Sequence, residues 1–160
     1  AVGLIDLAHT LSFAGMPDLV TFRNPEKAIN FWLAGRFVAA AVLLAVALRP
    51  LTHWSPLRSL GALLAALALS AGVWWLGIAH SEWLPRTFIA DEGLTGFKIG
   101  AEYLLAALYG LAGLLLYRKA ATRRDDDRLW LAAAAWVQGL AELFFAGPRR
   151  AVLHALCRRH

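Results

Sequence analysis

Four long apolar runs dominate this sequence, and three of them contain ionisable side chains. The runs cover residues 28–48, 60–79, 99–117 and 129–146. Each has about 18–21 residues, which as a helix matches the roughly 30 Å hydrocarbon core of a bilayer. A soluble protein with only 160 residues has too little interior to bury four such helices. The runs therefore predict an all-α fold, a polytopic transmembrane helical bundle.

A fifth, shorter apolar segment covers residues 1–13 and brings the expected number of membrane-associated helices to about five. It reads as the second half of a spanning helix, so we expect upstream helices that this chain lacks. Asn24 can cap the next helix and Pro25 can take its first position. Polar residues 118–128 are expected to link the last two spans. We interpret residues 1–146 as a partial transmembrane domain, and residues 147–160 as a basic tail, a truncated or altered last helix.

The net charge of +5 reflects basic residues that flank the spans, and no nucleic-acid-binding motif is present. Lysine and arginine concentrate in membrane-protein loops that stay in the cytoplasm. Residues 49–58 carry two arginines and no acid, and residues 118–128 carry five basic residues against three aspartates. We therefore expect these two loops in the cytoplasm, and residues 14–25 and 81–95 on the outer side. The lone Cys157 excludes an intrachain disulfide.

The ionisable side chains of the spans lie near their predicted outward ends. Their spacings of three or four residues place those of each helix on one face. An ionisable group in hydrocarbon costs roughly 2.5–3.5 kcal/mol, so several at one depth predict a shared polar pocket. Buried ion pairs that only hold helices together are the alternative, for example Arg36 with Asp6, Glu102 or Glu142. The expected pocket residues on these grounds are Asp6, His9, Trp32, Arg36, Lys98, Glu102 and Glu142.

Other functions fit parts of the same pattern. His9 and His80 are possible haem or metal ligands, because imidazole binds zinc, copper and haem iron. A redox membrane protein is therefore one alternative. A small proton-coupled transporter is another, with Asp6, Glu102 and Glu142 as relay carboxylates. The sequence contains no hydrolase, zinc-protease or phosphate-loop motif, and Asp6 with His9 has no evident nucleophile beside it.

Four segments carry a resemblance to a known family. They are LIDLAHTLSFAGM at residues 4–16, AINFWLAGR at 28–36, GLTGFKIGAEY at 93–103 and GLAELFF at 139–145. In this order they resemble the third class of bacterial membrane-associated sensor domain (MASE3). Thr95-Gly96-Phe97-Lys98 departs mildly from the usual x-Pro-Phe-Lys of that family. The family's last helix, which contains Gly and His, has no recognisable counterpart in residues 147–160.

The resemblance implies a function and a site. It implies a non-catalytic sensory input module in the bacterial inner membrane, at the N-terminus of a histidine kinase or diguanylate cyclase, including two-component systems. The module would bind an unidentified small molecule or ion and signal to a cytoplasmic output domain absent from this chain. We expect a homodimer formed through that domain, and no cofactor is specified. The expected ligand-binding residues are Asp6, His9, Thr10, Trp32, Arg36, His80, Lys98, Glu102, Tyr103 and Glu142.

Overall fold

The computed structural model describes residues 1–13, 24–49, 54–89, 93–123 and 125–146. Within these residues the chain forms an all-α membrane bundle, as the sequence predicts. Four of the described helices are long and apolar enough to cross a membrane. The helices are α1 (Val2–Ser12), α2 (Pro25–Leu48), α3 (Pro56–Ala79), α4 (Gly96–Arg123) and α5 (Asp126–Ala146), with a 3₁₀ turn η1 (Ser81–Trp83).

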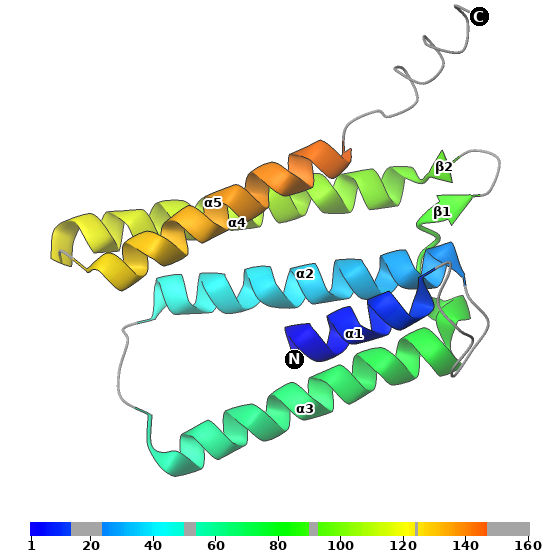
Figure 1. Cartoon of the computed structure of the whole chain (residues 1–160), viewed down its shortest axis with the longest axis horizontal. Coiled ribbons are helices and arrows are strands. Elements are labelled where there is room, and N and C mark those ends of the chain that lie inside the picture. Colours follow the sequence, from blue (N-terminus) through cyan, green and yellow to red (C-terminus); the bar gives the residue numbers. More distant parts are fainter. Residues whose placement is uncertain (14–23, 50–53, 90–92, 124, 147–160) are drawn as a thin grey trace, which may run out of the picture.

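Helix α2 lies in the middle of the bundle, between two groups of helices (Figure 1). The α4–α5 hairpin packs on one side of α2, and α1 and α3 lie on the other. The C-terminal end of α2, the N-terminal end of α3 and the α4–α5 turn share one end of the bundle. The C-terminal ends of α1, α3 and α5 meet the N-terminal ends of α2 and α4 at the opposite end. This second end is the one expected to face outward.

Side-chain caps explain where α2 and α3 begin. The Asn24 side chain accepts a hydrogen bond of 2.9 Å from the backbone N–H of Glu26, and Pro25 takes the first helical position. The start predicted for α2 is thus confirmed. Ser55 caps α3 in the same way, accepting from the N–H of Arg58 at 3.4 Å. Each cap satisfies a backbone donor that the helix itself cannot use.

Two features differ from the sequence prediction. The polar segment 118–128 was predicted as a linker, but α4 continues to Arg123 and α5 starts at Asp126. No glycine or proline occurs in residues 118–123, so α4 continues after its side chains become polar. The second feature is a short antiparallel hairpin of β1 (Phe88–Ile89) and β2 (Gly93–Leu94) before α4. Gly93 has φ of 88°, a conformation that favours glycine.

The outer surface of the bundle is apolar, as a bilayer requires. Helix α3 buries only Ser70 and Gly77. Most of its leucines are exposed, and so are large side chains of α5 such as Phe144, which is 81% exposed. In water such a surface would drive aggregation, whereas in lipid it is the expected exterior. The polar side chains that avoid this surface lie inside, between α2, α4 and α5.

Candidate ligand-binding site

Two buried carboxylates sit at the centre of the site, each beside a cation. Glu142 of α5 is fully buried, and its Oε1 lies 3.9 Å from Nε of Arg36 on α2. Gln138, one helical turn earlier, donates a hydrogen bond of 2.7 Å to the same oxygen. Glu102 of α4 is also fully buried and pairs with Lys98 on the preceding turn. The expected pairing of Arg36 with a carboxylate of another helix is confirmed, and Glu142 is that carboxylate.

The Trp32 indole joins the two ion pairs. The Arg36 guanidinium carbon and the Lys98 ammonium nitrogen each lie 5.4 Å from the centroid of the Trp32 ring. Both positions fall within the distance at which a cation is attracted to an aromatic face. The ring of Phe145 meets the same indole edge-on, with centroids 5.6 Å apart. Trp32 therefore connects α2 to both α4 and α5.

Helix α1 brings Asp6 and His9 to the α2 side of the site. An Asp6 carboxylate oxygen lies so close to Gly35 that a Cβ there would be 3.1 Å away. Glycine at position 35 thus allows α1 to approach α2 beside Arg36. Nδ1 of His9 lies 2.7 Å from the Ala28 carbonyl oxygen of α2. Because a carbonyl oxygen only accepts, Nδ1 carries the proton and donates this hydrogen bond.

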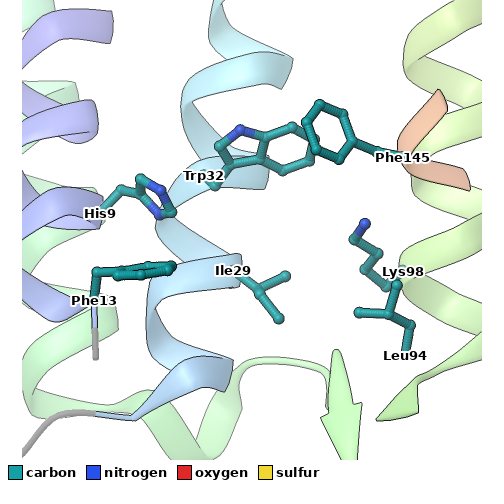
Figure 2. A pocket seen from close by; sticks show the side chains of 7 residues that line it. All are labelled: His9, Phe13, Ile29, Trp32, Leu94, Lys98 and Phe145. Carbon is teal, nitrogen blue, oxygen red and sulfur yellow. The ribbon is translucent and has the colours of Figure 1, made fainter. Parts of the chain in front are cut away.

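A cavity of about 410 Å³ opens between these helices. His9 and Lys98 approach it from opposite sides, and Trp32 and Phe145 lie together along one edge (Figure 2). The volume lies in the range of small-molecule pockets, about 300–1,000 Å³. Apart from Trp32, the apolar residues of the wall were not predicted from the sequence, because nothing distinguishes them from the apolar residues around them. The lining residues are His9, Phe13, Ile29, Trp32, Leu94, Lys98 and Phe145.

Of the ten expected ligand-binding residues, only His9, Trp32 and Lys98 line this cavity. Asp6, Arg36, Glu102 and Glu142 are not among its lining residues, and neither are His80, Tyr103 and Thr10. The His80 ring stacks on Trp83 at 4.3 Å and contacts Trp75 at 4.4 Å, at the end of α3. Tyr103 is 54% exposed. The exposed Thr10 donates a 2.9 Å hydrogen bond to the Asp6 backbone carbonyl. Sequence spacing placed these residues on the right helices but could not show which way the helices are turned.

Three buried polar atoms near the cavity have no hydrogen-bond partner among the described residues. They are Nε of Arg36, Oε2 of Glu102 and Oε2 of Glu142. Buried polar groups in proteins almost always have partners, so these atoms have spare hydrogen-bonding capacity. A group of three or more His, Cys, Asp or Glu side chains that could hold a metal ion does not occur in the described part of the chain. The chemistry of the site is therefore cation, carboxylate and aromatic.

Comparison with known proteins gives the family. Residues 1–150 match MASE3, the membrane-associated sensor domain. The searches of curated proteins and of solved structures gave no match. The match covers most of the chain, including every helix described above and all residues around the cavity. It agrees with the bundle of four candidate spans and with the motifs that surround Asp6, Arg36, Lys98 and Glu142. The chain therefore belongs to the MASE3 family of membrane-associated sensor domains, the input modules of signalling proteins.

Proposed function

We propose that this chain is the sensory input module of a bacterial signalling protein and binds a small molecule in the cavity beside Trp32. One observation carries the proposal: the cavity wall comes from both halves of the bundle. His9 and Trp32 belong to the α1–α2 side, whereas Lys98 and Phe145 belong to the α4–α5 hairpin. A bound molecule would contact both sides at once.

Such a molecule can change the bundle only if it binds two helix arrangements with different affinity. The contacts between α2 and α5 offer a point at which this can occur. They include the Trp32–Phe145 ring contact and the Arg36–Glu142 ion pair, and both lie at or next to the cavity. An occupant that displaces Phe145 or competes for Arg36 would shift the α4–α5 hairpin relative to α2. Coupling energies of about 1–3 kcal/mol are typical of such linkage.

The proposal extends to the location of the signalling protein and to its output domain. We propose an inner-membrane location, with the α2–α3 and α4–α5 connections in the cytoplasm. Movement of the α4–α5 hairpin would then reach the cytoplasmic side directly, at the turn between Arg123 and Asp126. A histidine kinase or diguanylate cyclase domain, dimeric in either case, would be the recipient of the signal. The exposed polar end of α4 suits such a contact.

Binding is tested with the purified chain in lipid nanodiscs. A library of small polar and lipophilic metabolites is screened for compounds that raise the melting temperature, since a ligand of the folded state stabilises it. Trp32→Ala removes the centre of the site, and the expected result is loss of the shift. Trp130→Ala is the matched control, because Trp130 is 75% exposed on α5. A stabilising compound that is equally effective on both variants would contradict binding in this cavity.

A further inference from the structure

We infer that the cavity takes a neutral, membrane-soluble ring compound that bears a hydroxyl group and a second oxygen, the hydroquinone (quinol) class. The inference rests on the proposed function and specifies its ligand. Four independent features of the site lead to it: the apolar walls, the balance of charge, the protonated nitrogen of His9 and the free donors of Lys98.

The walls select a ring compound that dissolves in the membrane. Five of the seven lining residues are apolar, and three of these are aromatic. Planar rings pack well against aromatic walls, either offset-stacked or edge-on. Phe13, Leu94 and Phe145 are 56%, 38% and 43% exposed, so the cavity is open at its rim. The rim lies at the outward ends of the spans, within reach of molecules dissolved in the outer leaflet.

The charges around the cavity select a neutral ligand. Arg36 and Lys98 contribute two positive charges, and Glu102 and Glu142 contribute two negative charges. The cluster is therefore balanced before any ligand arrives. An anion bound beside Lys98 would bring a third negative charge close to the buried carboxylates of Glu102 and Glu142, and the two cations cannot neutralise it. Because an unpaired buried charge is strongly unfavourable, a carboxylate or phosphate ligand is disfavoured here.

His9 selects a ligand that donates a hydrogen bond. Its Nδ1 carries the proton, because it donates to the Ala28 carbonyl oxygen. In a neutral imidazole the other nitrogen, Nε2, is then an acceptor. Nε2 has no hydrogen bond to any residue that the structure describes, and the ring lines the cavity. A hydroxyl group of the ligand can satisfy this nitrogen, whereas a carbonyl oxygen cannot.

Lys98 selects an oxygen acceptor on the opposite side of the cavity. An ammonium group has three donors, and the Glu102 carboxylate takes one of them. The remaining donors can bind an oxygen of a neutral ligand without breaking the ion pair. A quinol offers a donating hydroxyl to His9 and an accepting oxygen to Lys98. The corresponding quinone has two acceptors and no donor, so it leaves Nε2 of His9 unsatisfied. The site should therefore distinguish the reduced from the oxidised form.

Calorimetric titration of the chain in nanodiscs tests this inference. The probes are a 1,4-benzoquinol with a decyl chain, kept reduced under anaerobic conditions, and its quinone. Titration into empty nanodiscs corrects for partition into lipid. One net hydrogen bond corresponds to about a tenfold difference in affinity, and we expect the quinol to bind about tenfold more tightly. His9→Phe should remove this preference by weakening quinol binding alone, and His80→Phe should leave it unchanged.

A quinol analogue with both oxygens methylated probes the same contact without altering the protein. It keeps the ring and loses the donors, so it should bind no better than the quinone. Equal affinity for quinol and quinone, or a preference that survives His9→Phe, would overturn the inference. If another compound binds in a Trp32-dependent way while neither probe does, the ligand class is wrong and the proposed function stands. If binding of the probes is insensitive to Trp32→Ala, the cavity itself is not their site.

Discussion

At the residue scale, the main feature is how this bundle keeps four charges inside hydrocarbon. Glu102 and Glu142 are fully buried, and each has a cation within the site. The Lys98–Glu102 pair lies within one helix, one turn apart, and so forms as the helix forms. The Arg36–Glu142 pair joins two helices and forms only when they pack. The second pair thus contributes to the tertiary structure, and it is the pair that the proposed movement of the α4–α5 hairpin would disturb.

Replacement of Arg36 tests the interhelical pair. Arg36→Leu leaves Glu142 buried without its cation, and we expect the free energy of unfolding to fall by about 1–3 kcal/mol. This is less than the roughly 3–5 kcal/mol of a fully buried pair, because the Arg36 side chain is 30% exposed. The double variant Arg36→Leu/Glu142→Leu should recover part of the loss. Unfolding in detergent measures both, and Arg118→Leu on the exposed end of α4 is the control.

The sequence predicted the polar part of the site better than its apolar part. An Asp, Arg or Glu within an apolar run stands out, so Asp6, Arg36 and Glu142 were evident. Ile29 and Phe145 had no such contrast with their neighbours, although both line the cavity. Two signals could have pointed to Phe145: its position about one turn after Glu142 and its place in the GLAELFF segment at 139–145. The orientation that leaves Tyr103 exposed depends on how α4 is turned, which spacing alone does not show.

At the element scale, close helix contacts depend on small residues. The Phe31 ring of α2 is 2% exposed and packs against the backbone of Gly77 on α3. A side chain at position 77 would collide with this ring. Few other contacts hold α3, whose surface is largely exposed. Among the glycines of α3, Gly77 is therefore the one that leaves no room for a side chain.

Gly77→Ala tests this contact, with Gly72→Ala as a control on the same helix. A Cβ at position 77 meets the Phe31 ring, so we expect a loss of about 1–3 kcal/mol from overpacking. A Cβ at position 72 meets nothing within 4 Å, so the control should be neutral or slightly stabilising. Adding Phe31→Leu to Gly77→Ala should restore part of the stability. Equal melting temperatures for the two alanine variants would contradict the α2–α3 packing.

The helices themselves follow from the sequence, and their ends follow less well. Apolar length predicted all four spans, and Asn24 with Pro25 predicted the start of α2. The extension of α4 to Arg123 was missed, because a change from apolar to polar residues was read as the end of the helix. From Arg118 onward the side chains change from apolar to polar, while the backbone stays helical to Arg123. The hairpin at Phe88–Ile89 and Gly93–Leu94 is too short to show an alternating pattern.

At the scale of the whole molecule, the account depends on which end of the bundle faces outward. The residues that line the cavity come from the C-terminal ends of α1 and α5, the N-terminal ends of α2 and α4, and β2. Figure 1 shows that these helix ends lie toward the end of the bundle that carries the β1–β2 hairpin. The distribution of basic residues predicts that this end is outside the cell. The contacts between the helices would be the same whichever end of the bundle faced outward. Only a measurement of sidedness relates the cavity to a signal from outside.

Single-cysteine labelling of intact cells measures this sidedness. In a Cys157→Ser background, Glu82→Cys places a thiol at a position whose side chain is 63% exposed, at the end of the bundle that is expected to face outward. Ser55→Cys places one at the exposed start of α3, at the opposite end. An impermeant maleimide should label position 82 in intact cells and position 55 only after the membrane is permeabilised. The reverse pattern would show that the bundle is inverted.

The most direct test of the central claim is whether a water-soluble reagent reaches the cavity from outside. Ile29→Cys, again with Cys157→Ser, places a thiol on the cavity wall. Ala40→Cys on the same helix is 1% exposed in the core and serves as the control. A small, positively charged methanethiosulfonate added to intact cells should modify position 29 and spare position 40. Modification of neither position, or of position 29 only from the cytoplasmic side, would contradict an outward-facing pocket.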